Sequence, residues 1–157
     1  MGYVETVLQP GETVRFKTNY HWVAFIPGLA LLVLAVVSYW WSGRPNTWYA
    51  LWISLAVLLL AGAIILLVYA AYRRWITEIA ITDLRVIYKT GLLTRLTDEM
   101  PLGKVENIEI TQSILGRVLD YGNVDVQGTG AIGIGSDKLR RIASPLEFRD
   151  HILAGAA

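Results

Sequence analysis

The residues that most resemble a catalytic or cofactor motif are residues 128–133, which match the letters of the dinucleotide fingerprint Gly-x-Gly-x-x-Gly. A working fingerprint turns from a parallel strand into a helix, whose N-terminal N–H groups hold the pyrophosphate. Here residues 134–137 follow and contain no helical run, and Ile132 and Ile134 alternate with glycines. This pattern is typical of a glycine-rich hairpin, and the motif predicts no nucleotide cofactor.

Metal and nucleophilic chemistry have few candidate residues. The chain has two histidines and no cysteine. His21 precedes an apolar segment and His151 lies near the C-terminus, so a three-ligand zinc site is hard to assemble. We expect His21 to form hydrogen bonds at a membrane interface and His151 to lie on the exposed side of a helix. Since no nucleophile elbow or P-loop motif occurs either, we expect no catalytic residue, no metal, no cofactor and no enzymatic activity.

Basic side chains are the remaining candidates for binding. From residue 73 onward, eleven Lys and Arg stand against eleven Asp and Glu, so no basic face for nucleic acid is expected. Lys138, Arg140 and Arg141 form the one dense basic cluster, and such clusters are usually solvated turns. A contact with a partner or a lipid headgroup is the alternative. For that role we note Gly128, Gly130, Lys138, Arg140 and Arg141.

Two uncharged segments, residues 18–43 and 45–72, dominate the first half of this 157-residue chain. An α-helix needs about 20 apolar residues to cross the hydrocarbon core, and each segment is longer than that. We predict a transmembrane hairpin at residues 22–72, with helices at about 22–41 and 48–72 and a loop at 42–47. Small residues four apart, Ala24 with Gly28 and Ala50 with Ser54, could let its helices pack closely.

Charges at the ends of these segments predict the orientation. Arg15, Lys17, Arg73 and Arg74 flank the predicted hairpin, whereas its loop holds only Arg44. The positive-inside rule therefore places both termini in the cytoplasm, with the four flanking cations anchored on the membrane surface. Neither segment contains an Asp, Glu, Lys or Arg that would line a transport pathway, so the hairpin is expected to be an anchor.

After Arg74 the pattern changes to short alternating segments, which predict an antiparallel sheet with one wet face. Strands are expected at residues 76–82, 85–89, 92–100, 105–111 and 123–127. A short helical turn is expected at 113–119, and an amphipathic helix at 145–153 with Ser144 as its N-cap. Alternation in residues 13–18 leaves open whether this N-terminal segment, within residues 1–21, adds a strand to the sheet.

These segments resemble the bacterial pleckstrin-homology (PH)-like domain of small membrane proteins. The similarity covers residues 75–153 and also residues 8–22, and its most distinctive stretches are 111–117 and 121–124. The resemblance implies an α+β membrane protein. Its cytoplasmic part, residues 75–153, is expected to be a seven-stranded, bent antiparallel sheet or partial barrel capped by the C-terminal helix. It also implies a family that is not an enzyme class.

We therefore expect a multi-pass protein of the bacterial cytoplasmic (inner) membrane. Its predicted role is non-catalytic: presenting a cytoplasmic surface to a protein partner or to another copy of itself. One alternative is a sensor of anionic lipid headgroups that acts through Arg73, Arg74 and the basic cluster. Another is an accessory subunit of a transporter or membrane enzyme. The lipid bilayer is a partner in each case.

Overall fold

The computed structural model describes residues 3–44, 48–91, 96–129, 133–134 and 139–156. The chain divides into two compact units. Unit 1 combines residues 1–21 with residues 74–157, and unit 2 is residues 22–73. Unit 2 is thus an insertion between two parts of unit 1.

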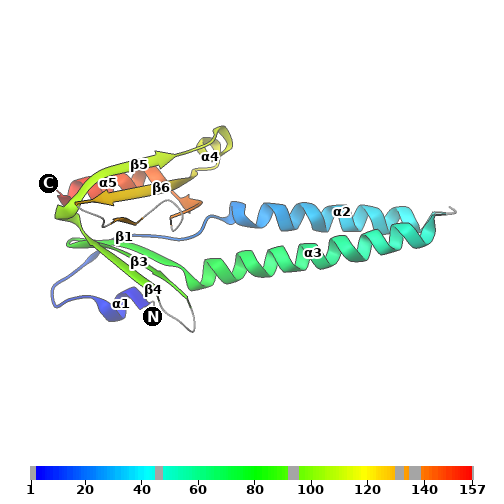
Figure 1. Cartoon of the computed structure of the whole chain (residues 1–157), viewed down its shortest axis with the longest axis horizontal. Coiled ribbons are helices and arrows are strands. Elements are labelled where there is room, and N and C mark those ends of the chain that lie inside the picture. Colours follow the sequence, from blue (N-terminus) through cyan, green and yellow to red (C-terminus); the bar gives the residue numbers. More distant parts are fainter. Residues whose placement is uncertain (1–2, 45–47, 92–95, 130–132, 135–138, 157) are drawn as a thin grey trace. The chain divides into compact units, whose positions relative to one another are not determined.

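The first sheet of unit 1 joins segments from both sides of this insertion. Its antiparallel order is β1 (Val14–Thr18), β2 (Glu78–Thr82), β3 (Arg85–Thr90) and β4 (Leu96–Pro101) (Figure 1). The N-terminal segment therefore does add a strand, with Thr18 opposite Ile79. Because β1 ends shortly before the insertion and β2 begins shortly after it, both ends of unit 2 continue into neighbouring strands.

The second sheet contains β5 (Val105–Thr111), β6 (Tyr121–Gly128), β7 (Gly133–Ile134) and β8 (Ile142–Ala143). The 3-10 turn η2 (Leu102–Lys104) precedes β5, and the short helix α4 (Ile114–Val118) connects β5 to β6. The α+β class with antiparallel sheets is confirmed. Where the resemblance implied one bent sheet, the described strands form two separate sheets and no closed barrel.

One apolar core lies between the two sheets and is closed by the C-terminal helix α5 (Pro145–Ala156). Val124 and Val126 of β6 are fully buried, as their alternation predicted, and Phe148 and Ile152 of α5 join them. Ser144 directly precedes α5, and its carbonyl oxygen accepts from the Phe148 N–H at 3.0 Å, as expected at the N-cap position. Its backbone has a φ of 48°, and its hydroxyl donates to Asp120 at 2.7 Å. A long-range partner thus takes the hydroxyl from the helix end.

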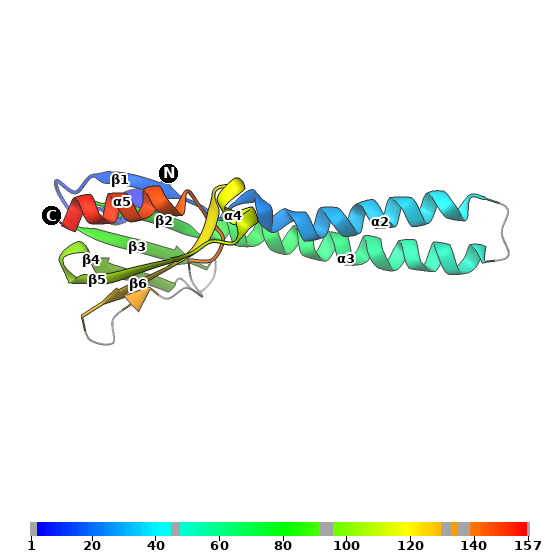
Figure 2. The same ribbon diagram turned by 90° about the horizontal axis from the view of Figure 1, so that it is seen from above.

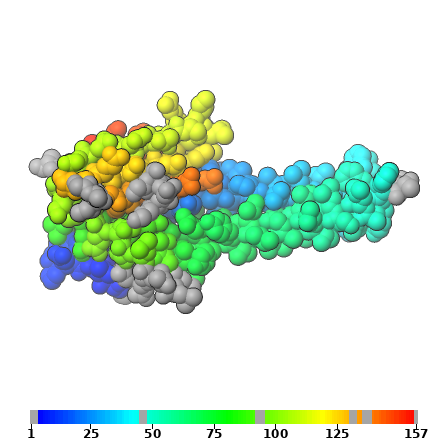
Figure 3. Space-filling model, in the orientation of Figure 1, coloured from blue at the N-terminus to red at the C-terminus, as the bar shows by residue number. Residues whose placement is uncertain are grey.

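The outer face of the first sheet is covered by the N-terminal helix α1 (Tyr3–Val7). Val4 is fully buried against Ala80 and Ile87, whose side chains point away from the main core. Figure 3 shows this blue N-terminal segment against the green strands. Burial on both faces explains why β2 reads as a nearly continuous apolar strand.

Unit 2 is a pair of apolar helices. A 3-10 turn, η1 (Trp22–Phe25), leads into α2 (Ile26–Ser42), with Pro27 in the first helical turn, and α3 (Tyr49–Ile76) returns. Trp22–Ser42 and Tyr49–Ile76 are long and apolar enough to cross a membrane by length and composition. Pro27 is tolerated because the first N–H groups of a helix have no intrahelical acceptor.

Small residues spaced seven apart line the contact between these helices. Gly28, Ala35 and Ser42 are buried on α2, and Ala56, Ala63 and Ala70 are buried on α3. A Cβ on Gly28 would lie 2.7 Å from Leu67 Cγ, so the backbones approach closely there. The Ser38 hydroxyl also donates to Trp52 O at 3.0 Å. Ala50 and Ser54 are exposed, so the predicted role of that pair in helix packing is wrong.

Replacing Ala63 by leucine should force the helices apart, because Ala63 is fully buried in their contact. We expect Ala63→Leu to destabilise the detergent-solubilised full chain by about 2 kcal/mol, the usual range for overpacking. Ala61→Leu is the matched control, since Ala61 is exposed on the same helix. Thermal or SDS-induced unfolding would measure both. Equal stability of the two variants would contradict close packing through the alanine stripe.

Candidate functional site

The most highly connected polar group in the described residues is a buried ion pair between Glu12 and Arg85. The Glu12 side chain is fully buried and that of Arg85 is 14% exposed. Arg85 Nη2 donates to Glu12 Oε2 at 2.8 Å and Nε donates to Oε1 at 3.0 Å, a bidentate arrangement. Nη2 also donates to the carbonyl oxygen of Val7. The N-terminal segment is thereby held on β3, 73 residues away in the chain.

Further hydrogen bonds complete this cluster. Glu12 accepts from the Gln9 backbone N–H at 2.7 Å and from the Thr82 hydroxyl at 2.7 Å. Arg85 Nη1 donates to Glu99 on β4 at 2.7 Å. The cluster therefore joins the N-terminal segment to three strands. We find no chemistry in it beyond this linkage, because its charges are paired with each other.

The pKa values of the two residues reflect this pairing. Burial alone would raise the pKa of Glu12, but hydrogen bonds from Gln9, Thr82 and Arg85 together hold it below its ordinary value. Hydrogen bonding to Glu12 raises the pKa of Arg85 despite burial. Sequence reasoning missed this pair, since nothing local indicates that Glu12 and Arg85 meet.

A second polar cluster lies at the end of unit 1 where the chain enters and leaves unit 2. We call it the junction end: it holds His21, Arg74, Tyr121 and Arg141, with the start of β6. The His21 ring stacks on Tyr121 at 5.4 Å, and its backbone N–H donates to Arg141 O at 2.8 Å. Burial lowers the pKa of His21, opposed by Asp120 and reinforced by Arg74.

One of the two histidines, His151, lies in a different place from that expected, while the expectation for His21 stays a prediction. His21 is buried within unit 1 and stacked on an aromatic ring. His151 is half-buried and stacks on Phe16 of β1 at 4.8 Å, so the prediction of an exposed helix side is wrong. Among the described residues, no group of three His, Cys, Asp or Glu is placed to hold a metal ion.

The predicted contact residues are dispersed. Arg15 and Lys17 are exposed on β1, Arg74 is exposed, and Arg73 is half-buried near the end of α3. Arg140 and Arg141 are exposed beside the buried Leu139. Gly128 ends β6, whereas Gly130 and Lys138 lie outside the described residues. These placements leave the proposed contact roles as predictions.

The glycine-rich segment forms the expected hairpin in its described part. β6 and β7 pair antiparallel, with Gln127 opposite Gly133 and Val126 opposite Ile134. A Cβ on Gly133 would lie 3.2 Å from Val126 O, so the strand backbones approach closely. An antiparallel hairpin lacks the helix N-terminus that a dinucleotide fingerprint needs.

Unit 1 has an open groove between β5 and α5. Its volume is about 440 Å³, and it is lined by Ile108, Ile110, Thr111, Gln112, Arg117, Leu146 and Arg149. We call it the β5–α5 groove. In the part of the chain that the structure describes, β5 has a paired strand on one side only, at β6. The groove thus runs beside a strand edge, where backbone groups can pair with an added strand.

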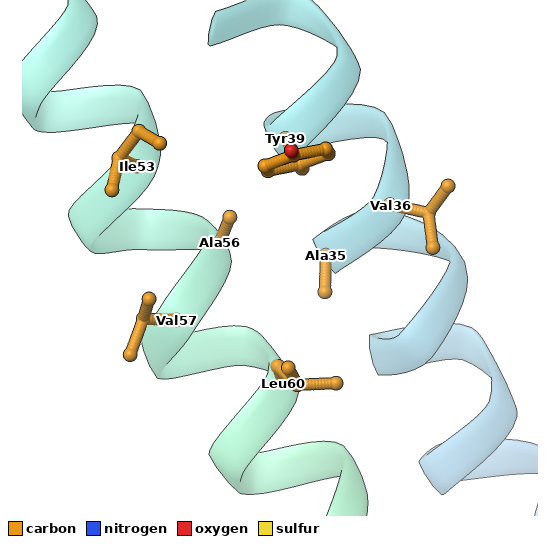
Figure 4. A pocket seen from close by; sticks show the side chains of 7 residues that line it. All are labelled: Ala35, Val36, Tyr39, Ile53, Ala56, Val57 and Leu60. Carbon is orange, nitrogen blue, oxygen red and sulfur yellow. The ribbon is translucent and has the colours of Figure 1, made fainter.

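Unit 2 has apolar hollows between its helices. Figure 4 shows one of about 390 Å³, which is lined by Ala35, Val36 and Tyr39 of α2 and by Ile53, Ala56, Val57 and Leu60 of α3. The small side chains of Ala35 and Ala56 leave this space. Nearly all of its lining is apolar, which suits hydrocarbon better than a polar ligand.

Together these features define a class: a small α+β domain of two antiparallel sheets and a C-terminal helix, with an apolar helical hairpin inserted after its first strand. The chain matches the model of the bacterial PH domain family over residues 7–156 and belongs to that family. The comparison with curated proteins found no match, and neither did the comparison with solved structures. Domains of the PH type are generally non-catalytic.

The Glu12–Arg85 pair should contribute more to stability than the Arg85–Glu99 pair, although the two distances are nearly equal. Removing one partner of a buried pair leaves a buried charge without full compensation, so we expect Glu12→Gln to cost about 3 kcal/mol. Glu99 is 33% exposed, and Glu99→Gln should cost about 1 kcal/mol or less. Denaturant unfolding of the full chain would compare them. A larger loss for Glu99→Gln would contradict this ranking.

The lowered pKa of Glu12 also predicts an acid-sensitive fold. Its ordinary value is about 4.5, so the unfolded chain binds a proton there at a higher pH than the folded chain does. The stabilisation is complete above pH 4.5 and is lost as the pH falls through the lower folded pKa. Stability measured from pH 7 to pH 3 should fall less steeply in Glu12→Gln than in the wild type. Parallel curves would show that Glu12 isn't responsible.

Proposed function

We propose that the chain is a membrane-anchored, non-catalytic PH-like domain that presents a binding surface to a protein partner at the cytoplasmic face. The apolar helices α2 and α3 are the anchor. Their length, their composition and the flanking cations support a two-pass arrangement with both termini inside.

The observation that carries this proposal is the insertion of the hairpin within the folded domain. Residues before and after it pair as β1 and β2, and the Glu12–Arg85 pair fastens the earlier segment. Two short covalent connections therefore link unit 1 to unit 2. A domain held in this way cannot leave the membrane, which suits a permanent scaffold better than a protein recruited on demand.

The β5–α5 groove is the surface that best fits a protein partner. The outer edge of β5 offers backbone groups, while Ile108 and Leu146 supply apolar contacts and Arg149 supplies charge. An extended segment of a partner would pair with β5 and lay alternate side chains into the groove. The partner can be another protein, including a transporter or membrane enzyme, or a second copy.

Binding of anionic lipid headgroups is the second candidate function. It is favoured by the placement of Arg74 and Arg141 about His21, at the end of unit 1 that is continuous with the hairpin. Each cation near an anionic leaflet contributes about 1 kcal/mol. Arg140, exposed beside Arg141, would add to this effect.

Native mass spectrometry of the full chain, extracted with its surrounding lipid, tests the scaffold proposal. We expect a protein adduct or a homo-oligomer that Leu146→Glu abolishes, because this charge enters the groove. Leu84→Glu is the control, since Leu84 is similarly exposed in the turn between β2 and β3. An adduct that survives Leu146→Glu unchanged would contradict the assignment of the groove.

The headgroup candidate has its own test in the same spectra. The double variant Arg140→Gln and Arg141→Gln should lose retained anionic lipid, and the loss should be larger at low salt, where exposed charges are least screened, than at high salt. Lys104→Gln is the control, because Lys104 is exposed in η2, beside the end of β6 farthest from His21. If the double variant and the control retain equal lipid, the basic cluster has no headgroup role.

A further inference from the structure

The short helix α4 exposes three large apolar side chains that contribute nothing to the core. Ile114 is 83% exposed, Leu115 66% and Val118 77%. Ile114 and Val118 are four residues apart, and Leu115 and Val118 are three apart, so all three share one face of the helix. Figure 2 shows α4 projecting from the connection between β5 and β6, and Figure 3 shows its side chains protruding from that surface.

The α4 helix that carries these exposed side chains is held in place by hydrogen bonds and by close packing. Ser113 caps the helix by accepting a hydrogen bond from Gly116 N at 3.1 Å, and Gln112 donates to Tyr121 O at 3.2 Å. On the inner face a Cβ at Gly116 would lie 2.6 Å from Tyr121 O. Only glycine allows this close approach, so α4 is held against β6 with its apolar face outward.

The position of α4 indicates what covers that face. Tyr121, on which α4 rests, stacks on His21, and His21 is the last residue before the first apolar helix. If α2 and α3 span the bilayer, His21 and Arg74 lie at its surface. The α4 helix then lies at the same surface, because only Tyr121 separates it from His21.

The charges at the junction end suit an anionic leaflet. Arg117 lies within α4 itself, is exposed, and has no ion-pair partner among the residues described here. Arg74, Arg140 and Arg141 are exposed at the same end. Apolar side chains beside cations are typical of segments that bury one face at the boundary of headgroups and acyl chains.

We propose that α4 inserts Ile114, Leu115 and Val118 into the cytoplasmic leaflet, as a third contact of the protein with the bilayer. This inference rests on the proposed membrane anchoring. The three apolar side chains are distinct from the protein-binding surface, because none of them lines the β5–α5 groove, whereas Arg117 of the same helix does. A bilayer is favoured over a second copy because the covalent junction brings α4 to the membrane whatever the oligomeric state.

Single-cysteine variants of the full chain test this directly, since the chain has no cysteine of its own. Leu115→Cys, Leu84→Cys and Leu58→Cys would each carry an environment-sensitive fluorophore in anionic nanodiscs that hold one copy. Leu84 is an exposed control at the opposite end of β2, and Leu58 is an exposed position within α3. Quenching by acyl-chain nitroxide lipids and by aqueous iodide is then compared.

We expect the Leu115 label to show blue-shifted emission, quenching by nitroxide lipid and loss of iodide quenching, while the Leu84 label shows the reverse. If iodide quenches Leu115 as strongly as Leu84 while Leu58 is quenched by lipid, the α4 inference fails and the anchoring stands. If Leu58 is not quenched by lipid, the anchoring itself fails. Protection of Leu115 that appears only in discs holding two copies would assign α4 to self-association and overturn the inference.

Discussion

The bidentate ion pair between Glu12 and Arg85 is the constraint on which the arrangement of this protein depends. It is buried, reinforced by Thr82 and Gln9, and bridges 73 residues of sequence. By fastening the N-terminal segment, it keeps β1 beside β2 and allows α1 to cover the outer face of the first sheet. The domain is therefore completed by residues on both sides of the hairpin.

The two connections between the domain and the hairpin reduce the orientational freedom of the domain. A PH-like domain attached by one linker could tumble, whereas two connections from adjacent strands restrict its orientation. If the hairpin spans a bilayer, as we propose, the junction end is held near the bilayer because the chain enters and leaves the hairpin there, and its cations and apolar side chains would need little affinity of their own. Weak contacts become effective when the entropy of orientation has already been lost in folding.

Local patterns predicted the elements well. β5 lies at residues 105–111 as expected, α5 includes the predicted segment, and α4 falls within the predicted helical turn. These elements depend on alternation, capping and spacing within a few residues. The seven-residue spacing of Gly28, Ala35 and Ser42 is also present in the sequence, whereas Ala50 and Ser54, four residues apart, lie outside the helix contact.

Long-range pairings couldn't be predicted in the same way. Ser144 has the residue type of an N-cap, yet Asp120 takes its hydroxyl, and His151 stacks on Phe16 from the other end of the chain. The outward orientation of the apolar face of α4 could not be predicted from local sequence either. Its sequence is that of an ordinary amphipathic turn, and only the fold reveals that the face is turned outward. Contiguous exposed apolar side chains are typical of surfaces that bind a partner or a membrane, and the proposed contact with the leaflet would remove these three from water.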